Sequence, residues 1–195
     1  MKSLIIATNN PGKRAELAAI LAPIECIPQS VFCIKNIAED KLSFVENALL
    51  KARHANAIGK KPALADDSGL VVPALNGEPG IFSARYAGDK ACDQDNITRL
   101  LEKLKAIPDP AWHAYFYCAI VIVQHPNDPT PIIACGRIDG QITASPQGSH
   151  GFGYDPVFYL PNYQCTMAQL PIAVKNTMSH RARALRQLRQ QLEAL

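Results

Sequence analysis

The sequence lacks any apolar run that approaches the roughly 20 residues of a membrane-spanning helix. We therefore expect no membrane partner. The apolar stretch at residues 4–7 meets polar residues and Pro11 almost at once. It is shorter than the apolar region of a signal peptide, so we expect a first β-strand and a cytoplasmic protein.

The sequence also lacks the cysteine spacings that mark zinc sites and disulfide scaffolds. No C-x-x-C pair occurs among its six cysteines. Zinc sites usually contain close pairs, and disulfide scaffolds are short and rich in cysteine. We expect reduced, mostly buried thiols that pack as small apolar side chains.

Charge of neither sign dominates the chain. The 20 Lys and Arg residues oppose 17 Asp and Glu residues, which gives a net charge of +3. This balance suits a protein that handles anionic small molecules, and it does not call for a nucleic-acid partner. With 195 residues, of which 48% are hydrophobic, the chain is long enough to bury the core of one domain.

A strand, a polar loop and a helix start follow one another near the N-terminus. After the strand at residues 4–7, Asn10 is typical of a helix N-cap and Pro11 of a first helical position. Amides at a helix N-terminus, together with Lys13, can bind phosphate through dipole and charge. The loop Thr8-Asn9-Asn10-Pro11-Gly12-Lys13 is thus a candidate phosphate cradle. It is not a Walker A loop, and an ordinary capped helix would give the same pattern.

Two adjacent carboxylates follow a second capped helix. Ser43 and Glu46 have the spacing of a capping box, and we expect this helix to end near Gly59. A short strand at residues 63–65 then runs into Asp66-Asp67-Ser68-Gly69. Such a group can hold a hard cation, because Mg²⁺ prefers one or two carboxylates plus water and substrate phosphates. Asp, Ser and Gly also favour turns, so a solvated turn is the alternative.

The second half of the chain adds a helix and further strands. Apolar residues at helical spacing predict a helix around Ile97 to Leu104. Residues 112–124 are rich in aromatic and β-branched side chains and predict a long strand, which a turn at residues 127–129 joins to another around Ile132. Asp139-Gly140 is typical of a further hairpin. Strands that alternate with helices and then continue as an antiparallel stretch indicate an α/β fold with a mixed sheet.

Two later segments could contact a nucleotide. In Gly151-Phe152-Gly153-Tyr154-Asp155-Pro156, two aromatic rings flank a glycine and could stack on a base, although a loop that packs its rings into the core is the alternative. Ser179 is expected to cap a basic final helix, so that His180 and Arg181, with Lys175 before them, could donate hydrogen bonds to carbonyl and phosphate oxygens. A solvated basic helix face would explain these residues equally well.

These motifs resemble a known family when they are taken together. The chain resembles the Ham1/RdgB-like family of dITP/XTP pyrophosphatases from residue 4 to about residue 188. The motifs are Thr8-Asn9-Asn10-Pro11-Gly12-Lys13, Ser43-Phe44-x-Glu46-Asn47-Ala48, Ala65-Asp66-Asp67-Ser68-Gly69-Leu70, Pro79-Gly80-Ile81-x-Ser83-Ala84-Arg85-Tyr86, Phe152-Gly153-Tyr154-Asp155-Pro156 and Ser179-His180-Arg181.

The resemblance implies one ITPase-like domain over residues 1–195. Its α/β fold would have a long mixed sheet flanked by helices, in two lobes with the active-site cleft between them. The implied activity is Mg²⁺-dependent hydrolysis of non-canonical purine nucleoside triphosphates (ITP, dITP, XTP and dXTP) to the monophosphate and pyrophosphate. The implied assembly is a homodimer, with no nucleic-acid partner.

The resemblance also assigns roles to residues. Asp67 would be the catalytic residue and a metal ligand, and Glu39 and Asp66 would be the other metal-site carboxylates. Glu46 is better explained by its capping box. The expected substrate-binding residues are Thr8, Asn9, Asn10, Pro11, Gly12, Lys13, Ser68, Phe152, Gly153, Tyr154, Asp155, Lys175, His180 and Arg181.

Within this set, we expect Phe152 and Tyr154 to stack on the base. We expect His180 and Arg181 to face its 6-oxo group. The chain departs from the family pattern after Glu39: the family usually has a glycine soon after this residue, whereas this chain reads Glu39-Asp40-Lys41-Leu42, so Asp40 competes with Glu39 as a ligand. It departs again at Ala173-Val174, where acidic residues are common before the lysine.

Overall fold

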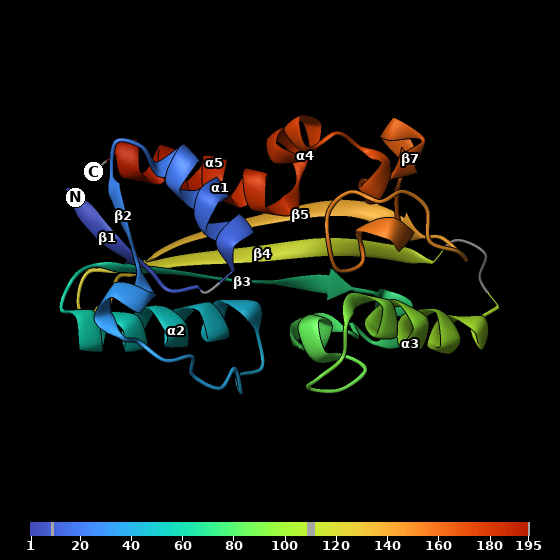
Figure 1. The fold of residues 1–195 in the computed structure, drawn as a ribbon, viewed down its shortest axis with the longest axis horizontal. Coiled ribbons are helices and arrows are strands. Elements are labelled where there is room, and N and C mark those ends of the chain that lie inside the picture. Colours follow the sequence, from blue (N-terminus) through green and yellow to red (C-terminus); the bar gives the residue numbers. More distant parts are fainter. Residues whose placement is uncertain (9, 109–111, 195) are drawn as a thin grey trace. The chain divides into compact units, whose positions relative to one another are not determined.

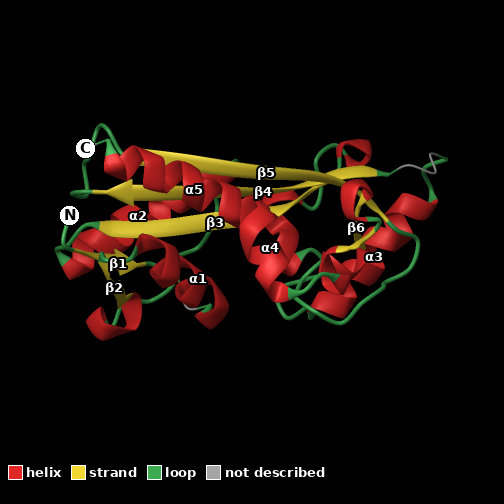
Figure 2. Ribbon diagram, turned by 90° about the horizontal axis from the view of Figure 1, so that it is seen from above, coloured by secondary structure: helices red, strands yellow, loops and turns green. Residues whose placement is uncertain are grey.

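The structure is a computed structural model that describes residues 1–8, 10–108 and 112–194. Within these ranges the chain forms a seven-stranded sheet and five α-helices (Figures 1 and 2). The strands are β1 (Ser3–Ile6), β2 (Glu25–Pro28), β3 (Ala63–Val71), β4 (His113–Val123), β5 (Ile132–Ile142), β6 (Phe158–Leu160) and β7 (Cys165–Thr166). The helices are α1 (Pro11–Leu21), α2 (Phe44–Gly59), α3 (Asp93–Lys105), α4 (Ile172–Met178) and α5 (His180–Glu193).

The sheet is mixed, as the sequence predicts. Its strand order is β2-β1-β3-β4-β5-β6-β7. β1 pairs in parallel with β2 and β3, whereas β6 pairs antiparallel with β5 and β7. Parallel neighbours need a crossover connection, and α1 and α2 supply it between β1, β2 and β3. The prediction of an α/β fold with a mixed sheet is confirmed.

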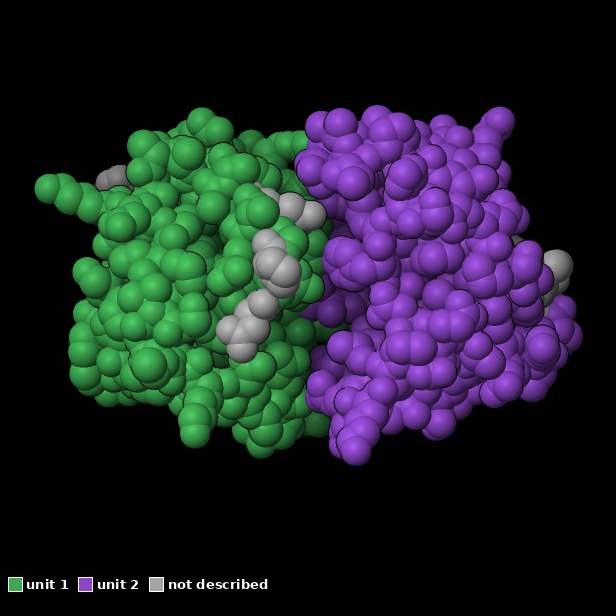
Figure 3. Space-filling view, viewed as in Figure 1, with its two compact units in different colours: residues 1–67, 118–136, 181–195 green, residues 68–117, 137–180 purple. Residues whose placement is uncertain are grey.

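The chain divides into two compact units, which Figure 3 colours separately. Unit 1 comprises Met1–Asp67, Cys118–Gly136 and Arg181–Leu195. Unit 2 comprises Ser68–Tyr117 and Arg137–His180. The three strands β3, β4 and β5 each contribute residues to both units.

The core of unit 1 has two apolar layers, one on each face of its strands. α1 and α5 cover one face, and α2 covers the other (Figure 1). Leu64 packs with Leu17 of α1 and Leu185 of α5. Its neighbour Ala63 packs with Ala52 of α2. Successive residues of a strand point to opposite faces, and this alternation continues along β3 to the carboxylates that follow.

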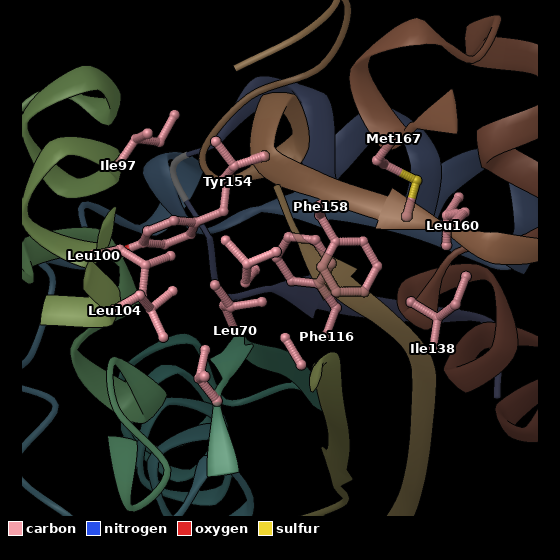
Figure 4. Close-up of a cluster of buried hydrophobic side chains, with 14 of the residues drawn as sticks. Leu70, Ile97, Leu100, Leu104, Phe116, Ile138, Tyr154, Phe158, Leu160 and Met167 are labelled. Atoms are coloured by element: carbon pink, nitrogen blue, oxygen red, sulfur yellow. The ribbon is translucent and has the colours of Figure 1, made fainter. Parts of the chain in front are cut away.

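The core of unit 2 is built around aromatic and branched side chains (Figure 4). Phe116 and Phe158 lie with their ring centroids 4.5 Å apart. The Tyr154 ring lies beside Ile97 and Leu100 of α3. This packing fixes the end of the glycine-rich loop that contains Tyr154.

Several local predictions are confirmed. Asn10 caps α1, since its side-chain oxygen accepts from Lys13 N at 3.0 Å. Ser43 caps α2, which ends at Gly59: its Oγ accepts from Glu46 N at 3.2 Å and donates to Glu46 Oε2 at 2.7 Å, which is the N-cap part of the predicted capping box.

In the part of the chain that the structure describes, no helix has both the length and the apolar character needed to cross a membrane.

Other local predictions are wrong for identifiable reasons. Asp139-Gly140 lies inside β5 and forms no hairpin. A Cβ on Gly140 would lie 2.5 Å from the carbonyl oxygen of Tyr159, so this glycine allows β6 to approach closely. The segment from Asp66 to Gly69 belongs to β3 and is no solvated turn. All six cysteines are free thiols as expected, but Cys118 alone is buried.

Candidate active site

The residues predicted to carry chemistry are grouped separately in the two units. In unit 1 the group centres on the middle of β3, where Asp66 and Asp67 are both buried. Asp66 shares the strand face of Leu64, toward α1 and α5, and Asp67 shares the face of Ala63 and Ala65, toward α2. The alternation of the strand therefore directs the two carboxylates to different partners.

Asp66 meets two cations. Its Oδ2 lies 2.7 Å from Lys13 Nζ of α1 and 3.8 Å from Arg181 Nε of α5. Burial alone would raise the pKa of Asp66, but Lys13, Arg181 and Lys51 outweigh it and hold that pKa well below its usual range. Asp66 is thus a fixed negative charge that orients Lys13 and Arg181.

Asp67 belongs to a different cluster, together with Glu39 and Lys51 of α2. Lys51 Nζ lies 2.7 Å from Glu39 Oε1 and 3.7 Å from Asp67 Oδ1. Burial raises the pKa of Asp67 to about 6; Lys51 opposes this rise, and Glu39 adds to it. Burial would lower the pKa of Lys51, but Asp67 and Glu39 raise it overall. A carboxylate whose pKa lies near neutrality can accept and release a proton at physiological pH.

Glu39 and Asp67 suit a hard divalent cation. Both carboxylates already converge on the ammonium of Lys51, and Mg²⁺ is commonly held by one or two carboxylates while water and phosphate oxygens complete its shell. Asp66 faces the other side of β3 and does not join them. Among the described residues, no three His, Cys, Asp or Glu side chains come close enough to hold a metal by themselves. Asp40 is exposed and pairs with its neighbour Lys41, so the geometry favours Glu39 over Asp40.

The predicted phosphate cradle is a capped helix start. Thr8 Oγ1 accepts from Asn10 N at 3.2 Å, and α1 begins at Pro11. Lys13, in the first turn, is directed to Asp66. Gly12 lies between them in α1. Asn9, also predicted to contact substrate, lies outside the described residues.

In unit 2 the predicted base-binding loop has two aromatic rings in different environments. The Phe152 ring is 49% exposed, whereas Tyr154 is 4% exposed and belongs to the core. Tyr154 OH donates to the carbonyl oxygen of Ser83 at 2.9 Å. Of the two rings, Phe152 is the one on the surface, so a stacking role is retained for Phe152, and Tyr154 anchors the loop.

Lys175 and Asp155 form a buried ion pair next to the exposed ring. Lys175 Nζ of α4 donates to Asp155 Oδ2, which also accepts from Phe152 N at 3.1 Å. The same ammonium lies 4.7 Å from the centroid of the Phe152 ring. A cation held against one ring in this way stabilises the ring's position.

His180 begins α5 and is buried in unit 2. Its imidazole stacks on Phe116, with centroids 4.9 Å apart and planes inclined by 16°. This stacking gives the His180 ring a fixed orientation, as a hydrogen-bond donor to a ligand requires.

Ser68, another predicted substrate contact, directly follows Asp67 in β3 and is half-buried.

Comparisons with known proteins identify the family of the chain. The model of the Ham1 family matches residues 4–191. A dITP/XTP pyrophosphatase of Legionella pneumophila is 61% identical over 97% of each chain. A HAM1 protein from Coxiella burnetii has a TM-score of 0.96 and 45% identity over all of both chains. The Ham1 protein of Staphylococcus aureus has a TM-score of 0.90 and 40% identity over 99% of each chain.

The chain belongs to the Ham1 family.

In this Ham1 chain, sequence reasoning missed three residues that the structure brings to the predicted sites. Lys51 joins Glu39 to Asp67; the signal for it in the sequence is a lysine three residues after Ala48, which is a buried residue of α2. Ser83 and Asp93 hold the Phe152–Tyr154 loop. No local pattern marks these two contacts, because each joins segments at least 60 residues apart.

Proposed function

We propose that this chain is a Mg²⁺-dependent pyrophosphatase that hydrolyses ITP, dITP, XTP and dXTP to the nucleoside monophosphate and pyrophosphate. Relatives that carry the name dITP/XTP pyrophosphatase match it over nearly their whole length, one at 61% identity. The observation that supports hydrolysis is the environment of Asp67: this buried carboxylate lies beside Lys51 and Glu39, and its pKa is raised to about 6.

Glu39 and Asp67 would hold Mg²⁺, which when bound neutralises charge on the phosphate oxygens. Asp67 accepts a proton from the attacking water, for which a pKa near 6 is suited. Lys51 balances the carboxylates and keeps Asp67 and Glu39 together. This division of roles is electrostatic, because phosphoryl chemistry depends mainly on positioning and on stabilising charge.

Thr8, Asn10, Pro11, Gly12 and Lys13 would bind the triphosphate. The N-terminus of α1 supplies amides and a positive dipole end. Asp66 fixes the ammonium of Lys13 at this helix start, which reduces the side-chain entropy lost on binding. Ser68, the residue after Asp67, would contact the same substrate.

The base would lie against Phe152, with Gly153, Tyr154 and Asp155 shaping the loop and Lys175 beside the ring. His180 and Arg181 would donate to the 6-oxo group of hypoxanthine or xanthine. Adenine carries an amine at that position and would leave these donors unpaired. A site built on such hydrogen bonds can reject the mismatched base by roughly 10⁴-fold.

The test is pyrophosphate release from ITP, XTP, GTP, ATP and dUTP, with and without Mg²⁺. We expect ITP and XTP to be turned over in the presence of the metal, and Asp67→Asn to lower turnover by roughly 10²-fold or more. Near-normal turnover by Asp67→Asn at saturating Mg²⁺ would exclude Asp67 as the base. Preference for ATP or dUTP would exclude the proposed substrate class.

A further inference from the structure

Asp93 makes a long-range contact for which the proposed mechanism has no use. It is the first residue of α3 and is exposed. Its Oδ2 accepts a hydrogen bond from Gly153 N at 2.6 Å, across 60 residues of sequence. Hydrogen bonds to a charged acceptor are roughly twice as strong as neutral ones. One exposed carboxylate thus holds the middle of the Phe152–Tyr154 loop.

The loop is held at three consecutive residues. Phe152 N donates to Asp155, Gly153 N donates to Asp93, and Tyr154 OH donates to the Ser83 carbonyl oxygen. The flanking contacts lie in buried or half-buried surroundings, while the central one lies at the surface. The central contact can therefore be removed without opening the core.

Packing does not replace the central contact. Gly153 has a φ of +60°, in the left-handed region, and among the described residues other than Phe152, Gly153 and Tyr154 no heavy atom lies within 4 Å of where its Cβ would be. With open space on that side, hydrogen bonds must define the local backbone. The N–H of Gly153 is directed to Asp93.

The support beneath Asp93 is itself fixed. The buried side chain of Asn96, one turn along α3, accepts from Ala87 N at 2.8 Å and donates to the carbonyl oxygen of Ala84 at 3.3 Å. Ala84 lies in the 3-10 helix Gly80–Arg85, which also contains Ser83. The two supports of the loop, Asp93 and Ser83, are thus tied to each other.

We propose that Asp93 is a positioning residue that fixes the backbone at Gly153 and, through it, the direction of the Phe152 ring. The Tyr154 ring is locked in the core on one side of Gly153, and the exposed Phe152 ring lies on the other. The inference rests on the proposed function in one respect, that the substrate base stacks on Phe152. Asp93 itself touches no substrate.

The experiment compares Asp93→Ala and Asp93→Asn with a matched control, Asp95→Ala. Asp95 lies in the same first turn of α3 and is also exposed, but its carboxylate accepts a hydrogen bond from Cys92 N. Asp95→Ala therefore removes the same charge from the helix start and leaves the hydrogen bond to Gly153 in place. Two quantities are measured for each protein. They are the hydrogen-exchange rate of the Gly153 amide in the free protein and the KM and kcat for ITP.

For Asp93→Ala we expect Gly153 exchange to rise roughly 10- to 100-fold, as for loss of a charged hydrogen bond. We expect KM to rise about tenfold with little change in kcat, because stacking binds the ground state and the transition state alike. Asp93→Asn keeps a side-chain oxygen as acceptor and should recover most of both effects. Asp95→Ala should change neither quantity.

Each contrary result has a distinct meaning. Unchanged Gly153 exchange in Asp93→Ala would overturn the proposal, and so would faster exchange with an unchanged KM. Equal effects of Asp93→Ala and Asp95→Ala would reduce the role of Asp93 to helix stability and overturn it as well. If the unmodified protein fails to hydrolyse ITP and XTP, the proposed function fails, while Gly153 exchange still decides whether Asp93 holds the loop.

Discussion

Asp66 and Asp67 are consecutive residues of β3, yet their carboxylates meet different cations on opposite faces of the strand. Asp66 contacts Lys13 and Arg181, and Asp67 contacts Lys51. Their pKa values move in opposite directions as a result: that of Asp66 is lowered, and that of Asp67 is raised to about 6. Environments that separate the pKa values of two neighbouring carboxylates assign them different roles. Here Asp66 orients cations, and Asp67 is suited to proton transfer.

The raised pKa of Asp67 predicts how stability depends on pH. Its ordinary value is 3.8. Because the folded state binds this proton more tightly than the unfolded state, the stabilisation is fully present below about pH 4 and is lost as pH rises through about 6. Between pH 5 and pH 8 the wild-type protein should lose about 1.4 kcal/mol through this group. The measurement is urea unfolding of wild type and Asp67→Asn, in EDTA, at pH 5 and at pH 8. The free energy of unfolding of Asp67→Asn relative to wild type should be about 1.4 kcal/mol higher at pH 8 than at pH 5. A difference between the two proteins that does not change with pH would contradict the raised pKa.

Glu39 and Asp40 can be separated by their Mg²⁺ requirement. Glu39 contacts Lys51 beside Asp67, whereas Asp40 is exposed and pairs with Lys41. We expect Glu39→Gln to raise the Mg²⁺ concentration for half-maximal turnover roughly tenfold or more, as for loss of a charged ligand contact of 1.5 to 3 kcal/mol. Asp40→Asn should leave it unchanged. The reverse result would make Asp40 the metal ligand.

Lys13 should distinguish triphosphate from monophosphate. Lys13→Ala is expected to weaken binding of a non-hydrolysable ITP analogue by about 1.5–3 kcal/mol and to weaken IMP binding less. Arg14→Ala is the control, because it removes the same charge from the next residue. Arg14 lines a separate pocket with Ala18 and Cys26, and Lys13 is not among the residues of that pocket. Calorimetric titration gives both affinities. Equal loss for the two nucleotides would place the phosphate cradle elsewhere.

Arg181 and Phe152 should affect base choice differently. Arg181→Ala is expected to narrow the ratio of kcat/KM for ITP over ATP, because adenine's amine leaves the donors unpaired at about 1–3 kcal/mol each. Phe152→Ala should lower kcat/KM for both substrates together, since stacking tolerates any base. Arg181 Nε lies 3.8 Å from Asp66, the partner of Lys13. An equal drop for ITP and ATP in Arg181→Ala would therefore assign Arg181 to the phosphates.

A homodimer is proposed from the family resemblance. Light scattering at micromolar concentration should give about twice the 21.2 kDa mass of one chain. A mass near that of a single chain at the same concentration would contradict it.

Local signals in the sequence were enough to predict several elements of this protein and its family. Capping residues such as Asn10 and Ser43 act on amides within three residues, so the starts of α1 and α2 could be predicted from the sequence. A prediction from a local sequence pattern was wrong where contact with a distant segment sets the backbone conformation. Gly140 permits the approach of β6 and makes no turn, although Asp-Gly is a common turn pair.

Which candidate side chains lie together depends on long-range contacts, which the sequence did not reveal. The sequence placed Asp66 and Asp67 side by side, but the faces that β3 presents to α1, α5 and α2 separated them. Lys51 reached Asp67, Asp93 reached Gly153, and the Tyr154 ring entered the core while that of Phe152 stayed exposed. The physical reason is range: capping and strand alternation act over a few residues, whereas ion pairs and packing join residues that only the folded chain brings into contact.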